Sequence, residues 1–199
     1  MTIIYFPLAI ISLLVAAPVI YIIGRLGWRL GRRRLEQVSA WLTILAFLVS
    51  ALFLTLAASQ STVSGTASIR VGAILLRFDG LSLLLGVVAL GLGGLVALYS
   101  IAYMDREPGA EKYFAMLATM TGVMIGLGCA ADLFNLWVWF EAMAVSSYLL
   151  VAFYRAQPAS LEAGVKYLVQ SSAGSVLVLL GIALVFMQTG SLSLDEIAA

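Results

Sequence analysis

Six apolar runs of membrane-spanning length recur along the chain, and they limit it to folds that can cross a lipid bilayer. Backbone amides and carbonyls find no water inside a bilayer, so a spanning segment forms either a helix or part of a closed barrel. These runs lack the alternation of apolar and polar residues that barrel strands require. We therefore predict an all-α, polytopic membrane protein with six transmembrane helices, at residues 3–23, 38–58, 81–103, 113–130, 133–153 and 163–187.

The composition agrees with a membrane protein and excludes several other classes. Hydrophobic residues make up 63% of the chain and charged residues 11%, against about 45–50% and about 25% in soluble domains. A net charge of +1 gives no electrostatic footprint for nucleic acid, so we expect no such partner. The chain has no histidine and a single cysteine, Cys129, so we expect no metal site. No Gly-rich phosphate loop is visible either, so we expect no cofactor.

The loop charges predict an orientation, because Lys and Arg accumulate in cytoplasmic loops. Two opposite loops hold only Arg70 and Arg77, so we expect an integral protein of the bacterial inner membrane with its N-terminus outside. The Arg29–Arg34 loop then lies in the cytoplasm, although this cluster also suits anionic lipid or a soluble partner. The eight basic residues on the proposed cytoplasmic side are Arg25, Arg29, Arg32, Arg33, Arg34, Arg106, Lys112 and Arg155.

Residues between the runs predict local structure. Asp79 precedes the third run and is a typical helix N-cap, and Ser160 is a candidate N-cap for the sixth helix. The segment 67–77 favours a short hairpin on the outer face.

Glu141 is the most informative single residue, because it lies near the middle of an apolar run. No other ionisable acid or base lies between Leu133 and Phe153. An ionised carboxylate at that depth costs on the order of 2.5–3.5 kcal/mol on insertion scales. Proteins seldom carry such a group unless it serves an ion or proton path, although a structural carboxyl bonded to a neighbouring helix is the alternative. Tyr148 shares the helical face of Glu141 and can donate a hydrogen bond into a water-linked path.

Lys166 is the second ionisable side chain inside a predicted span. Apolar surroundings favour the neutral forms of carboxyl and amine groups, whereas a nearby opposite charge favours their charged forms. A Glu and a Lys that alternate between paired and separate states can thus take up and release protons. The alternatives are a helix-stabilising pair with Glu162, four residues earlier, and a lysine whose ammonium reaches the membrane interface.

Three segments resemble a known family of membrane subunits. The segment 132–151, DLFNLWVWFEAMAVSSYLLV, resembles the fifth-helix motif of antiporter-like, proton-translocating subunits. These subunits occur in respiratory complex I, multisubunit sodium/proton antiporters and membrane-bound hydrogenases. The segment 162–175 resembles the family's sixth helix, and 77–82 resembles the start of its third helix. The similarity covers about 78–188, and the first two spans match only in character.

The resemblance implies specific roles. Glu141 matches a key glutamate of the family's proton channel, which is coupled to a lysine on a broken seventh helix. Lys166 matches a further polar residue on the channel side. Redox chemistry resides in other subunits of those complexes, so the resemblance implies no redox cofactor and no catalysis by this chain alone.

The same resemblance implies a shorter chain than usual. Family members have about fourteen helices, including two inverted five-helix repeats. Residues 1–77 would form two N-terminal helices and an outer loop, and 78–199 four helices that begin the first repeat. We expect either a fragment or a split subunit that another chain completes.

The resemblance implies two functional hypotheses, and a third, of another class, stays open beside them. The first is a proton-translocating subunit, or its N-terminal fragment, of a complex I-like NADH:quinone oxidoreductase that uses a Glu/Lys relay. The second is a subunit of a sodium/proton antiporter, with Na⁺ as a further transported ion. The third is a membrane scaffold or assembly protein without transport. The first two require other membrane subunits as partners.

Overall fold

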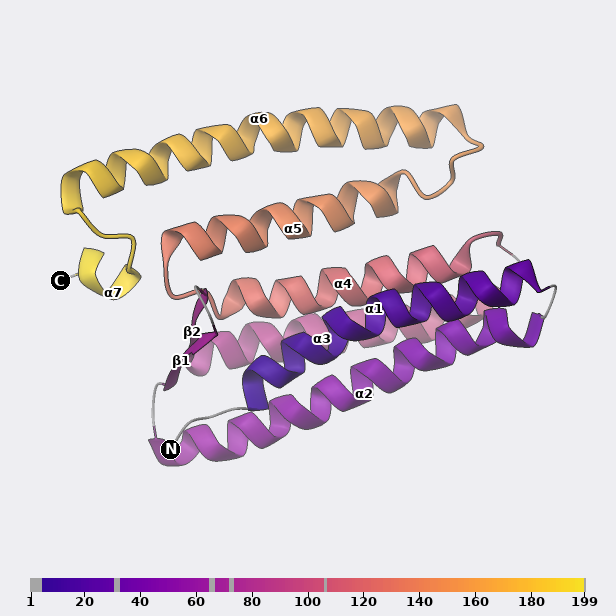
Figure 1. Cartoon of the computed structure of the whole chain (residues 1–199), viewed down its shortest axis with the longest axis horizontal. Coiled ribbons are helices and arrows are strands. Elements are labelled where there is room, and N and C mark those ends of the chain that lie inside the picture. The colour runs from indigo at the N-terminus through magenta and orange to yellow at the C-terminus, as the bar shows by residue number, and fades with distance from the viewer. Residues whose placement is uncertain (1–4, 31–32, 65–66, 72–73, 106, 199) are drawn as a thin grey trace.

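The computed structural model describes residues 5–30, 33–64, 67–71, 74–105 and 107–198, and long antiparallel helices dominate it (Figure 1). Helices α1, α3 and α5 end, and α2, α4 and α6 begin, at the same end of the molecule, here called the basic end (Figure 1). The strands and α7 lie at the other, here called the hairpin end (Figure 1). In chain order the elements are α1 (Tyr5–Arg29), α2 (Arg33–Ser64), β1 (Ala67–Val71), β2 (Ile74–Phe78), α3 (Gly80–Tyr103), α4 (Ala110–Gly128), α5 (Leu133–Val151), α6 (Pro158–Thr189) and α7 (Leu194–Ile197).

The all-α membrane class is confirmed, but the predicted number of spans is wrong. Within the described residues, five helices are long and apolar enough to cross a membrane: α1, α2 from Val38 to Gln60, α3, α5 and α6. The fourth predicted span, 113–130, corresponds to α4, which is a helix but falls short of that apolarity. Its first turn carries Glu111 and Lys112, and it packs against α1, α3 and α5, so its surface is largely buried by protein.

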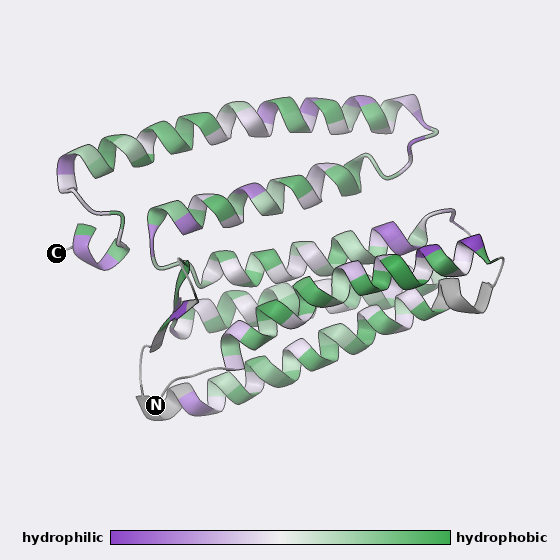
Figure 2. Ribbon diagram, in the orientation of Figure 1, coloured by the Kyte–Doolittle hydropathy of each residue, from purple (hydrophilic) through white to green (hydrophobic). Residues whose placement is uncertain are grey.

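Hydrophobic residues cover most sides of the long helices, and hydrophilic residues gather at the ends and on parts of α5 and α6 (Figure 2). The buried core lies among α1–α4 and includes Phe6, Leu13 and Phe114. The rings of Phe6 and Phe78 stack at 5.1 Å and tie α1 to β2. By contrast, α5 packs on α4, and α6 packs mainly on α5. Most of the apolar surface of α6 therefore faces outward.

The predicted hairpin is present and anchors the start of α5. Strands β1 and β2 pair antiparallel, with Ser68 opposite Arg77; the turn residues 72–73 lie outside the described part of the chain. The other edge of β2 binds the segment after α4: Arg77 N donates to Cys129 O at 2.7 Å. The same segment also binds the chain after α6, because Leu194 N donates a hydrogen bond to Ala131 O at 3.1 Å. The hairpin end thus joins three distant parts of the chain around the first turn of α5.

The cap at Asp79 is confirmed, and the cap at Ser160 is wrong. Asp79 accepts a hydrogen bond from Ser82 N at 2.9 Å, and this bond lowers the pKa of the carboxyl below its usual value. The sixth helix begins at Pro158, with Gln157 at the N-cap, because proline suits the first turn, where no amide donor is needed. Ser160 instead donates to Val151 O at 2.8 Å.

Candidate functional site in helices α5 and α6

Helix α5 holds the candidate proton site and has a fixed beginning. Asp132 caps it by accepting a hydrogen bond from Asn135 N at 2.7 Å, and Leu133 N donates to Leu192 O at 2.9 Å. These bonds satisfy amides that a helix start leaves without partners. Glu141 lies more than two turns further along, in the middle of the helix and of the apolar segment.

Glu141 is partly buried and incompletely bonded. Its Oε1 is buried and has no hydrogen-bond partner, the one such side-chain nitrogen or oxygen within the described residues. A buried polar atom left without a partner costs roughly 1–3 kcal/mol, more if the group is charged. Buried polar atoms nearly always find a partner, so the exception at Glu141 calls for an explanation, such as a proton, a water or a group from another segment.

The side of α5 that carries Glu141 faces α6. Trp137, one turn earlier on this side, donates from Nε1 to Ser175 Oγ of α6 at 2.8 Å, and Ser175 is 5% exposed. Nearer the basic end, Gly164 of α6 fits against α5: a Cβ at Gly164 would lie 2.7 Å from Ala152 Cβ. These two contacts fix the antiparallel register of the two helices and place Glu141 between them.

Tyr148 and Lys166 are placed differently by the structure. Tyr148 lies two turns from Glu141 on the same side of α5, as predicted, and its backbone carbonyl faces Gly164. Lys166 lies on the outer side of α6, and its side chain is 73% exposed. The Lys166 ammonium forms an ion pair with Glu162 at 2.5 Å, one turn earlier. The described structure therefore unites Glu141 and Tyr148 on one face but does not bring Lys166 to Glu141.

A second buried carboxylate, Glu111, was not singled out from the sequence. It is 4% exposed. Its backbone lies so close to α1 that a Cβ at Gly24 would be 2.3 Å from Glu111 Cβ. The sequence shows only an acidic residue in the first turn of a helix. That residue can be recognised as buried only once the packing of the neighbouring helices is known.

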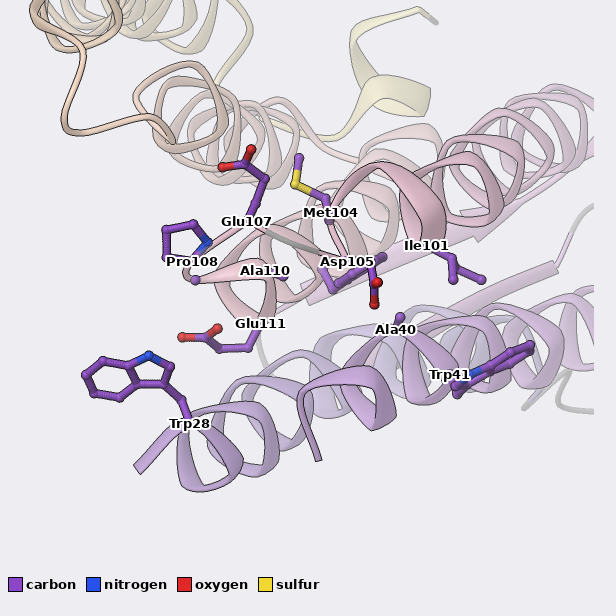
Figure 3. Close-up of a pocket in the computed structure, with 12 residues that line it drawn as sticks. Trp28, Ala40, Trp41, Ile101, Met104, Asp105, Glu107, Pro108, Ala110 and Glu111 are labelled. Carbon is purple, nitrogen blue, oxygen red and sulfur yellow. The ribbon is translucent and has the colours of Figure 1, made fainter. Parts of the chain in front are cut away.

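Glu111 lines a cavity of about 300 Å³ at the basic end (Figure 3). Asp105 and Glu107 also line it, but the three carboxylates point in different directions (Figure 3). Trp28 and Trp41 lie on its far sides. Among the described residues, no group of three or more His, Cys, Asp or Glu side chains could hold a metal ion. We therefore assign this cavity no ligand.

Two family descriptions match separate parts of the chain. Residues 65–114 match "NADH-Ubiquinone oxidoreductase (complex I), chain 5 N-terminus". Residues 130–199 match "NADH:quinone oxidoreductase/Mrp antiporter, TM", which includes all of α5 and α6.

Curated relatives come from both branches of these descriptions. Na(+)/H(+) antiporter subunit A1 of Staphylococcus haemolyticus is 34% identical over 62% of this chain and 15% of its own length. The chloroplastic NAD(P)H-quinone oxidoreductase subunit 5 of Zygnema circumcarinatum is 33% identical over 61% of this chain and 17% of its own. The chain thus spans about a sixth of the length of these relatives.

A solved structure shares the fold over nearly the whole chain. It belongs to the membrane-bound sulfane sulfur reductase, described as an archaeal respiratory membrane complex. The TM-score is 0.82 at 25% sequence identity, and the match covers 97% of this chain and 39% of that one.

Proposed function

This chain belongs to the family of antiporter-like membrane subunits of complex I-type oxidoreductases and multisubunit antiporters, and on that premise we propose that it translocates protons. The observation that carries the proposal is Glu141, an intramembrane carboxyl group with one buried oxygen that lacks a partner. A group in that state can accept a proton and give it up when an opposite charge approaches. The protein works, in this proposal, as one membrane subunit of a larger complex.

Each proposed residue has a separate role. Glu141 holds the proton, and Tyr148 directs a hydrogen bond or a water along the α5–α6 face. Lys166 lies on the outer side of α6, away from Glu141, so it acts on proton transfer only through a further helix or subunit that meets its ammonium. Glu162 holds that ammonium at 2.5 Å until such a segment replaces it. Electron transfer takes place in other subunits.

Sodium dependence separates the two transport hypotheses. The experiment uses the whole complex in liposomes with a pH-sensitive dye inside, in sodium-free medium and in medium with sodium. Proton movement that is driven by electron transfer and persists without sodium supports the oxidoreductase subunit. Proton movement that requires an opposing sodium gradient supports the antiporter, which the similarity to antiporter subunit A1 favours. If neither kind of proton movement is observed, the scaffold hypothesis is the one that remains.

We also propose that the basic end faces the cytoplasm of a bacterial cell. Arg29, Lys112 and Arg155 lie at this end; Arg32 and Arg106 lie outside the described residues. A cysteine introduced at Arg29 is expected to react with a membrane-impermeant maleimide only from the cytoplasmic side. Cys129 gives no background, because it is 1% exposed and burial raises the pKa of its thiol to about 12. Labelling from the outside would show that the basic end faces outward, opposite to the proposed orientation.

A further inference from the structure

A cavity of about 670 Å³ opens at the basic end, where α1, α4 and α5 come together. It is distinct from the α5–α6 face that carries Glu141. Its lining combines two cationic side chains with aromatic rings and aliphatic side chains, a mixture that suits an amphiphilic ligand and not a soluble ion. The cationic and the apolar side chains occupy different parts of the lining.

The cationic part consists of Lys112 in the first turn of α4 and Arg155 in the α5–α6 connection. Neither forms a salt bridge with a described residue, whereas Arg77 and Lys166, elsewhere in the chain, both do. Glu107 is the acidic residue in the lining, so the cavity keeps an excess of one positive charge. Two cationic donors that line one cavity favour a phosphate oxygen.

The apolar part follows α4 and α5 toward the membrane interior. Leu149 and Leu150 of α5 and Met116 of α4 line it. Above them, the ring of Phe153 packs edge-on against Tyr113 at 5.8 Å and against Tyr154 at 5.1 Å. Aromatic rings at the end of membrane helices mark the headgroup level, so the cations lie at headgroup depth and the leucines at acyl-chain depth.

We propose that this cavity binds one anionic phospholipid, with its phosphodiester at Lys112 and Arg155 and an acyl chain along Leu149 and Leu150. Charge decides the class of lipid, because two cations outweigh the single carboxylate of Glu107. Basic pockets between membrane helices on the cytoplasmic side are suited to anionic headgroups. A bound lipid would fill the gap beside the α4–α5 contact and hold α5 at its loop end.

Binding of a fluorescent phosphatidylglycerol to the full chain in detergent micelles tests the proposal. The double variant Lys112→Gln/Arg155→Gln is expected to weaken binding roughly thirtyfold, because each cation at headgroup level contributes to the attraction of an anionic lipid. Arg29→Gln is the matched control, since it removes one charge at the same end outside the cavity, and it is expected to change the affinity less than threefold. Unlabelled phosphatidylglycerol should displace the probe, and phosphatidylcholine should not.

Four results would overturn the proposal. Equal losses for Arg29→Gln and for either single variant at Lys112 or Arg155 would mean that general surface charge attracts the lipid. Displacement by phosphatidylcholine as effective as that by phosphatidylglycerol would mean an apolar groove without charge selection. Displacement by glycerol 3-phosphate would mean a site for soluble phosphate esters. Lys112→Arg keeps the charge and should keep the affinity. In the fourth result, Lys112→Arg binds the lipid weakly although its helical content is intact, which would mean that the charge at this position is not what holds the lipid.

Discussion

Replacing Glu141 with glutamine is expected to slow proton translocation through this subunit by about 10²-fold while the protein remains in the membrane. Glutamine has nearly the same shape and can fill the same space, but it cannot accept and release a proton. It also removes the cost of an intramembrane carboxyl group, so membrane insertion and the α5–α6 contact should persist. Proton uptake by liposomes that hold the assembled complex measures the effect, and the amount of assembled complex gives the correction.

Lys166→Ala is the comparison for that experiment. Lys166 is exposed and paired with Glu162, so its loss should reduce translocation less than the loss of Glu141. Unchanged translocation in Glu141→Gln would remove Glu141 from the proton path. A larger effect at Lys166 than at Glu141 would mean that the lysine, through a segment on the outer side of α6, is the more important group.

Gly24→Ala is expected to destabilise the helix bundle by about 1–3 kcal/mol, the usual cost of forcing an extra carbon into a packed interior. Its Cβ would lie 2.3 Å from Glu111 Cβ and 3.3 Å from Ser39 Cβ, so α1 would be pushed away from both α4 and α2. The contact atom Glu111 Cβ is attached directly to the backbone of α4 and cannot move aside without the helix. Thermal unfolding of the purified chain in detergent measures the loss.

Gly91→Ala is the matched control in the same bundle. Gly91 also lies inside a membrane helix, but nothing is within 4 Å of a Cβ placed there. The added methyl group should leave the unfolding temperature unchanged or raise it slightly, because alanine favours helix more than glycine does. Equal losses at both positions would show that helix propensity, and not the close approach of α1 to α4, sets the effect.

Much of the fold was accessible from the sequence because membrane helices and their ends depend on local features. The apolar runs gave the positions of α1, α3 and α5 to within a few residues at most ends, and Asp79 marked the start of α3. The position of α4 was also predicted to within three residues, but α4 is not apolar enough to count as a span, and neighbouring helices cover most of its surface. Ser160 failed as a cap because Pro158 begins α6 one turn earlier.

The candidate site was only partly predictable, because it depends on how the helices face each other. Helical spacing alone put Tyr148 on the side of Glu141. The same spacing could not tell which side of α6 meets α5; Gly164 and Ser175 define that side and leave Lys166 on the outer one. Burial of Glu111 depends on how several helices pack together, so no single segment of the sequence predicts it.

The most direct test of the account is the protonation of Glu141 itself. Infrared difference spectra of the working complex can follow the carbonyl band of a protonated carboxyl group. We predict a band that appears and disappears during turnover in the wild type and is absent from Glu141→Gln. The same band in both proteins, or no carboxyl change in either, would contradict a proton-carrying role for Glu141.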